Sequence, residues 1–131
     1  MATATARIGT EFYRTAITTG HHMLTADEPA SRGGADAGPA PYDLLLSALG
    51  ACTAITLRMY ADRKGWPIET LDVALRLVGG PDGNRVERLL TIVGPDTAAQ
   101  TRLAEIAERT PVTLTLKSGI AIHTTLSTPT L

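Results

Sequence analysis

The stretch "LLLSALGACTAITL", from Leu44 to Leu57, is almost entirely apolar, and it is the clearest structural signal in the chain. Pro41 and Asp43 just before it suit the first turn of an α-helix, where a missing N–H is tolerated and a negative charge is favoured. Basic residues up to Lys64 suit the last turn, and Gly65 suits the position just beyond the helix. The pattern therefore predicts one helix from about Pro41 to about Lys64.

This helix has no polar face between Leu44 and Leu57, which predicts burial on all sides. About 24 residues of helix measure roughly 36 Å, whereas a domain of this size has a radius of gyration of about 14 Å. One small domain has difficulty covering so long an apolar rod. We therefore expect a homodimer that buries it as a central helix.

The rest of the chain shows strand and turn patterns around two helices. A second helix is expected over residues 96–109, where Thr97 and Gln100 fit a capping box and apolar residues recur at helical spacing. A Gly/Pro/Ala-rich loop precedes the first helix over residues 28–41. Strands are expected over residues 3–18, 22–27, 70–78, 85–93 and 119–126. This β-β-α-β-β-α-β order predicts a single α+β domain over residues 1–131.

Composition excludes several classes of protein. Lys and Arg number 12 and Asp and Glu number 13, so no global basic field indicates a nucleic-acid or membrane-surface partner. The N-terminus lacks a signal-peptide pattern, and the longest apolar block is about a dozen residues, too short to span a bilayer. A single cysteine cannot form an internal disulfide and suits a reducing compartment, so we expect the cytoplasm.

The single cysteine, Cys52, has two interpretations. It can be a small apolar residue in the core, or a reactive thiol whose charge a nearby cation or helix N-terminus stabilises. Its own helix begins about three turns earlier, so any activation must come from another segment or subunit. Asp43 precedes it by nine residues, which places the two on opposite helix faces. Asp43 therefore suits a helix-start acid, or a partner for an Arg or His.

The histidines also allow two interpretations. His21 and His22 form either an exposed turn pair, or a site where one imidazolium supports a thiolate across a subunit interface. Together with His123 they lack any recognised metal-binding spacing, so no metal is expected. Phosphate-loop, dinucleotide and nucleophile-elbow motifs are absent from the sequence, so no cofactor is expected.

The segment "ADEPASRGGADAGPAPYDLLLSALGACTAITLRMYADRKGWPIETLDVALRL", residues 26–77, resembles the OsmC/Ohr family of osmotically inducible and organic-hydroperoxide-resistance proteins. A weaker similarity covers "LAEIAERTPV" and the closing strand. The resemblance implies an OsmC-like, intertwined α+β homodimer with the long helices at its centre. It also implies two active sites at the subunit interface.

The resemblance further implies a thiol chemistry. Reactive members of the family reduce organic hydroperoxides: a helix cysteine becomes a sulfenic acid, a second cysteine resolves it, and dithiols restore the pair. Cys52 falls on the reactive position. Thr110 stands where the resolving cysteine is expected, and Thr113 and Leu114 stand where His and Arg are usual. The two-cysteine cycle is therefore unavailable within this chain, and a sulfenic acid on Cys52 would need an external thiol or dithiol.

Other family roles fall on several candidates. The activating cation corresponds to the turn with His21 and His22, with Arg14 and Arg32 as further candidates. The helix-start acid falls on Tyr42 or Asp43, of which Asp43 is the chemically sensible choice. The leading hypothesis is a thiol-dependent peroxidase that uses Cys52, His21 or Arg32, and Asp43. The alternative is a non-catalytic dimer that binds a small apolar ligand in the same interfacial pocket. Whether the protein is an enzyme is left open by the sequence.

Overall fold

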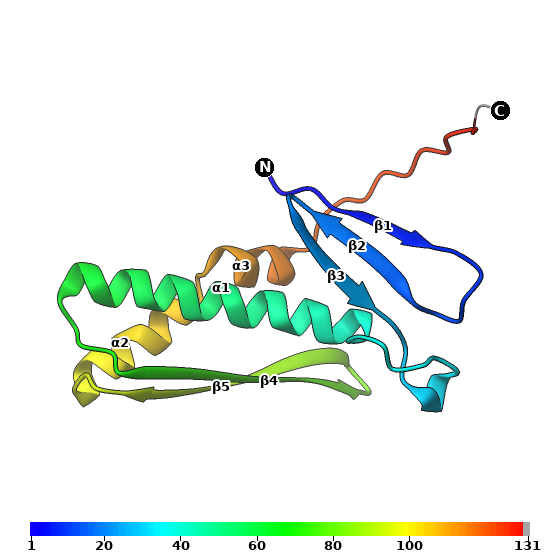
Figure 1. Cartoon of the computed structure of the whole chain (residues 1–131). Helices are drawn as coiled ribbons and strands as arrows, with labels where there is room; N and C mark the ends of the chain where they lie inside the picture. Colours follow the sequence, from blue (N-terminus) through cyan, green and yellow to red (C-terminus); the bar gives the residue numbers. More distant parts are fainter. Residues whose placement is uncertain (130–131) are drawn as a thin grey trace. The chain divides into compact units, whose positions relative to one another are not determined.

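The helix predicted over the apolar stretch is present in the computed structural model, which describes residues 1–129. Helix α1 spans Pro41–Lys64 (Figure 1), as the sequence predicted. Gly65 follows it at a φ of 71°, a left-handed conformation that ends a helix and favours glycine. The start and stop signals in the sequence therefore fixed both ends of α1.

Burial on α1 is one-sided within the chain. Leu49, Thr53, Leu57 and Ala61 recur every four residues and are buried. Ile55 and other apolar residues between them remain exposed. A single chain therefore covers only one face of this helix, and burial of the other face in a homodimer stays a prediction.

Within the described residues, α1 is the one helix whose length and composition would allow it to cross a bilayer. This corrects the expectation that no segment reaches that length. The small residues Ser, Thr, Gly and Ala interrupt the large apolar residues but do not make the helix strongly polar. Core helices of soluble proteins meet the same criterion, so the finding alone is weak evidence for a membrane span.

The chain forms two compact units, and the first comprises residues 1–50 and 74–88. Its sheet is antiparallel, with strand order β1-β2-β3: β1 is Thr5–Ile8, β2 is Thr15–Thr19 and β3 is His22–Ala26 (Figure 1). The single strand predicted over residues 3–18 is thus two strands joined over residues 9–14. The returning strand was predicted correctly.

One buried carboxylate organises the loop between β3 and α1. Asp27 is 2% exposed and accepts hydrogen bonds from four backbone N–H groups, those of Tyr13, Glu28, Ala35 and Ala37. These donors, the Ala37 N–H first, hold the pKa of the Asp27 carboxyl below its ordinary value, although burial opposes the shift. The loop, which contains the short helix η1 (Ala30–Arg32), is therefore ordered around a charged carboxylate.

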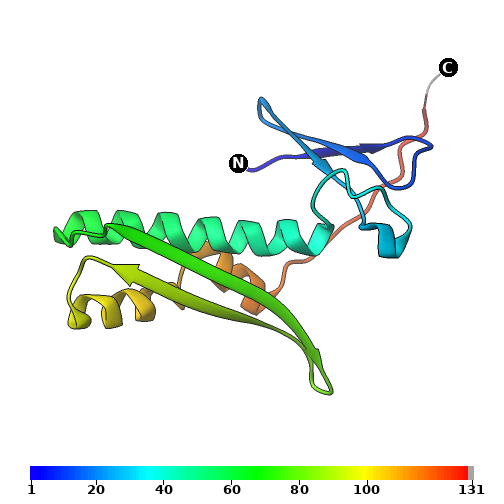
Figure 2. The same ribbon diagram turned by 60° about the horizontal axis from the view of Figure 1, so that its bottom comes forward.

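The predicted central hairpin is also present. Strands β4 (Thr70–Gly80) and β5 (Gly83–Val93) form a two-stranded sheet joined by a tight turn (Figure 2). In β4, half-buried residues alternate with more exposed ones from Leu71 to Leu77, as the period-two pattern predicted. The ends of this hairpin that lie next to α1 and α2 in the sequence belong to the second unit.

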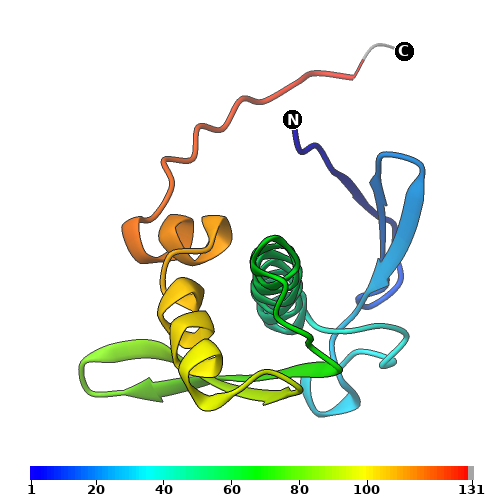
Figure 3. The same cartoon turned by 90° about the vertical axis from the view of Figure 1, so that its left-hand side faces the viewer.

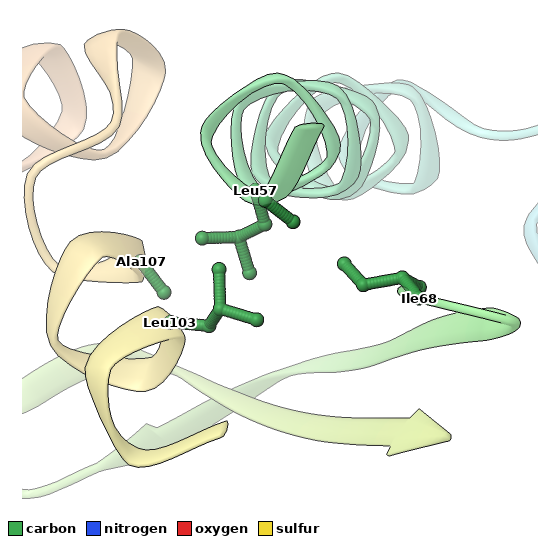
Figure 4. Close-up of a cluster of buried hydrophobic side chains, with 5 residues drawn as sticks. Leu57, Ile68, Leu103 and Ala107 are labelled. Atoms are coloured by element: carbon green, nitrogen blue, oxygen red, sulfur yellow. The ribbon is translucent and has the colours of Figure 1, made fainter. Parts of the chain in front are cut away.

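The second unit comprises residues 51–73 and 89–131, of which residues up to 129 are described. Its core contains Leu57, Leu103 and Ala107, with Ile68 beside them (Figure 4). Leu103 and Ala107 come from α2 (Thr97–Ala107), so the predicted apolar stripe of the second helix faces the core.

The capping box predicted for α2 is wrong. The N-cap is Asp96, one residue earlier, whose carboxylate accepts the Ala99 N–H at 2.9 Å. Gln100 instead donates its side-chain amide to the Pro95 carbonyl at 2.9 Å. Asp96 has the extended backbone that an N-cap requires, which leaves Thr97 as the first helical residue.

After α2 the structure differs from the prediction in two ways. A third helix, α3 (Pro111–Ser118), was not predicted. Residues 119–129 follow as an extended segment without strand pairing (Figure 3), so the strand predicted over 119–126 is wrong for the single chain. A strand needs a neighbouring strand to satisfy its backbone, and residues 1–129 of this chain supply none to this segment.

Candidate functional site

The candidate site is built around the half-buried thiol of Cys52 on α1. Its sulfur accepts the backbone N–H of Val112, with 3.4 Å between Sγ and N. On the other side, the Thr56 hydroxyl lies 3.9 Å from the sulfur, one turn along the same helix. Polar groups from two different helices therefore contact this thiol.

The Val112 amide is available because of its position in α3. Val112 is the second residue of this helix, and the first N–H groups of a helix have no partner within it. Those groups also carry the positive end of the helix dipole, which stabilises negative charge on a nearby sulfur. Helix α3 is therefore a second segment that contacts the Cys52 sulfur, and its support of a thiolate stays a prediction.

Sequence reasoning missed this contact because it missed α3. The signal was present: Pro111 occupies the first helical position, Thr110 precedes it as N-cap, and Gly119 follows the helix at a φ of 77°. Because α3 is only eight residues long, its periodic pattern was too short to stand out.

Thr110, where a resolving cysteine was expected, lies beside this contact. It is fully buried, two residues before Val112, and its hydroxyl lies 2.6 Å from the Thr113 hydroxyl. The Thr113 hydroxyl in turn donates to the Ala107 carbonyl at 3.3 Å. The position is therefore occupied by a hydrogen-bonded hydroxyl that cannot form a disulfide.

The histidines lie elsewhere in the chain. His21 and His22 are exposed at the turn between β2 and β3, with ring centroids 4.1 Å apart. His123 is exposed in the extended C-terminal segment. Over residues 1–129, no group of three or more His, Cys, Asp and Glu residues could hold a metal ion.

Arg32 and Asp43 belong to the first unit, as His21 does, whereas Cys52 belongs to the second. Arg32 is exposed at the end of η1. Asp43 lies in the first turn of α1, where its carboxylate accepts the Ala40 N–H at 3.3 Å. Asp43 is thus a helix-start acid, and a role for any of these three residues at Cys52 stays a prediction.

Comparison with known proteins identifies relatives of this fold. An OsmC-like protein from Mycoplasma pneumoniae has a TM-score of 0.77 and 21% identity, over 89% of this chain and 87% of that one. The organic hydroperoxide resistance protein OsmC of Legionella pneumophila has a TM-score of 0.66 and 21% identity, over 89% of each chain. The organic hydroperoxide resistance protein OhrB of Bacillus subtilis has a TM-score of 0.61 and 21% identity, over 88% of this chain and 90% of that one.

At these identities the likeness shows the fold, and it confirms the predicted OsmC-like α+β architecture. No curated protein matches the chain by sequence. A family model described as OsmC-like protein matches residues 33–125, which include Cys52, the central hairpin, α2 and α3. The chain therefore belongs to the OsmC family.

Proposed function

We propose that the protein is a thiol-dependent organic hydroperoxide reductase that acts through Cys52. The observation that carries this proposal is the contact between the Cys52 sulfur and the Val112 N–H at the start of α3. A backbone donor at this place stabilises the thiolate, which is the nucleophilic form of cysteine. The names of the Legionella and Bacillus structures, both organic hydroperoxide resistance proteins, support the choice of substrate class.

In the proposed reaction, the Cys52 thiolate attacks the distal oxygen of a hydroperoxide ROOH. The O–O bond breaks, an alcohol leaves after taking up a proton, and Cys52 becomes a sulfenic acid. We propose that His21 or Arg32 of a second subunit supplies a cation to the thiolate, and that Asp43 orients this cation. A histidine in this role would make the rate depend on pH near neutrality, whereas an arginine would not.

The sulfenic acid requires a reductant from outside the chain. Thr110 offers a hydroxyl, and Cys52 is the only cysteine in the sequence. We propose that an external thiol attacks the sulfenic sulfur, releases water and forms a mixed disulfide, and that a second thiol then restores Cys52. A dithiol would complete both steps with one molecule.

A homodimer would provide the apolar surroundings that the proposed site lacks in one chain. On α1, Leu45, Ile55 and Met59 are 39%, 54% and 56% exposed. In the C-terminal segment, Ile120 and Ile122 lie on either side of Ala121 and are also exposed. Such a segment is suited to add a strand to a sheet of a second copy. We propose that each chain is one OsmC-like domain of this dimer, and that it works in the cytoplasm.

A second function is favoured by one observation. With Thr110 in place of a resolving cysteine, the site could bind a small apolar ligand at the dimer interface without chemistry. This binding protein would use the same exposed face of α1. The two functions differ in whether Cys52 is oxidised.

One experiment separates them. The purified protein is mixed with one equivalent of cumene hydroperoxide, and free thiol and intact mass are followed over time. The peroxidase proposal predicts rapid addition of one oxygen atom to Cys52, reversed by a small thiol or dithiol. A thiol that is still unreacted after minutes would leave only the binding function. Cys52→Ser serves as control and should not gain oxygen.

A further inference from the structure

Two of the three positions where this chain departs from the expected family pattern, 110 and 113, carry side chains that bond to each other. The Thr110 and Thr113 hydroxyls lie 2.6 Å apart, and both residues are buried, with 0% and 4% exposure. Neither hydroxyl has a part in the proposed reaction. Burying hydroxyl groups is costly unless they are hydrogen-bonded, and these two hydroxyls meet that condition through each other.

The direction of the hydrogen bonds follows from the number of hydrogen atoms. Each hydroxyl has one hydrogen to donate. When Thr113 donates its hydrogen to the Ala107 carbonyl at 3.3 Å, the hydrogen between the two hydroxyls comes from Thr110. The result is a chain of hydrogen bonds from Thr110 through Thr113 to Ala107 at the end of α2.

These hydrogen bonds end at a core residue, and they join the residues on either side of the one that contacts Cys52. Ala107 is 2% exposed and packs in the same cluster as Leu57 and Leu103. Val112, whose N–H reaches the sulfur, lies between Thr110 and Thr113 in the sequence and in the first turn of α3. Fixing the two threonines to the end of α2 therefore fixes the amide that faces Cys52.

No charged side chain adjoins the sulfur on the elements that contact it. Cys52 is the only ionisable residue of α1 from Leu44 to Leu57, and the sequence from Thr110 to Leu116 has none. The charged residues at the ends of this region are Glu108, Arg109 and Lys117, and Lys117 is paired with Glu108 at 3.2 Å. Within the second unit, the Val112 backbone amide is therefore the polar group best placed to control the reactivity of the Cys52 thiol.

We propose that Thr110 and Thr113 are positioning residues for Cys52, because their hydroxyl pair holds the Val112 amide against the sulfur. The departures at 110 and 113 then form one device, a fixed hydrogen-bonded turn at the place where a resolving thiol was expected. This inference rests on the proposed function only in taking Cys52 as the reactive thiol.

The test measures the rate of Cys52 alkylation by iodoacetamide as a function of pH. Cys52 is the only cysteine, so the whole signal comes from it. Thr113→Val keeps the side-chain shape and removes the hydroxyl. Without this hydroxyl, the Val112 N–H should no longer be held against the Cys52 thiolate. We expect the alkylation rate near neutral pH to fall by about tenfold, which corresponds to losing one hydrogen bond to a charged group. At alkaline pH, where every thiol is ionised, the rate should equal or exceed that of the unmodified protein.

Further variants distinguish positioning from general stability. Thr110→Val should give the same shift, and the double variant should add little, because each change breaks the hydrogen bond between the two threonines. Thr113→Ser keeps a hydroxyl and should restore the profile. Thr101→Val is the matched control, since its exposed hydroxyl donates to the Thr97 carbonyl at 3.0 Å and lies outside the device. It should leave the profile unchanged.

Variants that melt at a lower temperature but keep an unchanged pH profile would overturn the proposal, because the threonines would then have only a structural role. If Thr113→Val does not fold, Thr110→Ala decides, since it breaks the same bond and leaves the Ala107 carbonyl with its donor. Alkylation needs no hydroperoxide. A negative result here is therefore distinguishable from failure of the peroxidase proposal.

Discussion

At Cys52, two helices supply the neighbours of one sulfur atom. Thr56 comes from the same helix, and the Val112 amide comes from α3, sixty residues later. The sequence identified Cys52 through its motif and identified Thr110 as a departure from the family pattern. It could not identify Val112, because a backbone amide has no residue type and its position depends on a distant fold contact.

Thr110→Cys should supply the missing resolving thiol. Position 110 lies two residues before the amide that contacts Cys52, so a thiol there is close to the oxidised sulfur. After treatment with a hydroperoxide, we expect an intramolecular disulfide, seen as a loss of about 2 Da in intact mass instead of a gain of one oxygen.

The matched control is Thr101→Cys, which adds a thiol on the exposed surface of α2. It should accumulate the sulfenic acid on Cys52 and form no internal disulfide. If Thr110→Cys behaves in the same way as this control, position 110 does not reach Cys52 in the oxidised protein.

Asp27 should make the first unit sensitive to acid. Its carboxyl has a pKa below the ordinary 3.8, because backbone N–H groups, that of Ala37 first, hydrogen-bond to the charged form. A lowered pKa stabilises the folded state above pH 3.8, and this stabilisation is lost as the pH falls through the folded-state pKa. Asp27→Asn should therefore lower the melting temperature at neutral pH and flatten its decline in acid.

The measurement is a series of thermal melts from neutral to acidic pH. Asp36→Asn makes the same change of charge in the same loop, at an exposed residue whose φ of 54° asparagine tolerates. It should leave both the melting temperature and its acid dependence nearly unchanged. Equal effects of the two substitutions would show that the buried hydrogen bonds of Asp27 contribute nothing specific.

Among the elements, those with local signals at both ends were predicted best. Helix α1 has Pro41 at its start and Gly65 beyond its end, and the hairpin has turn residues between alternating strands. The strand predicted over 119–126 failed for the opposite reason. Its alternating side chains can be seen in the local sequence, but the strand with which it would pair lies elsewhere. The sequence therefore could not show whether the same chain provides that partner strand.

The connection from β5 to α2 gives a prediction at this scale. Gly94 has a φ of 125°, and a Cβ there would lie 2.0 Å from the Pro67 carbonyl oxygen. Next to it, Glu69 donates its N–H to the Val93 carbonyl at 2.7 Å. Backbone strain alone should lower the free energy of unfolding of Gly94→Ala by about 1–3 kcal/mol. The steric overlap with the Pro67 carbonyl should lower it further.

Chemical denaturation measures this loss, and Gly9→Ala is the control. A Cβ at Gly9 would meet open space, and the backbone there has no positive φ, so the substitution should be nearly neutral. Similar unfolding free energies for the two variants would mean that the connection moves easily to admit a side chain.

At the scale of the whole molecule, α1 has two apolar faces, of which one is buried within the chain and the other is exposed. Leu49 and Leu57 are buried within the chain, whereas Leu45, Ile55 and Met59 are exposed along another side of the helix. The sequence indicated that α1 needs more cover than one small domain provides. It could not assign faces, because both are apolar and the choice depends on where the other elements pack.

Ile55→Glu tests whether a second copy covers the exposed face. Ile55 is 54% exposed, so a charged residue there leaves the core of the single chain intact, but it would place an unpaired charge inside a dimer interface. We expect a folded protein that sediments and scatters light as a monomer at micromolar concentration, while the unmodified chain is a dimer. Thr101→Glu adds the same charge to the exposed surface of α2 and should remain dimeric. Leu57→Ala should act differently, since it removes a fully buried side chain and should lower the free energy of unfolding by about 2–5 kcal/mol. An unmodified chain that is monomeric under these conditions would rule out the dimer, and with it a catalytic cation from a second subunit.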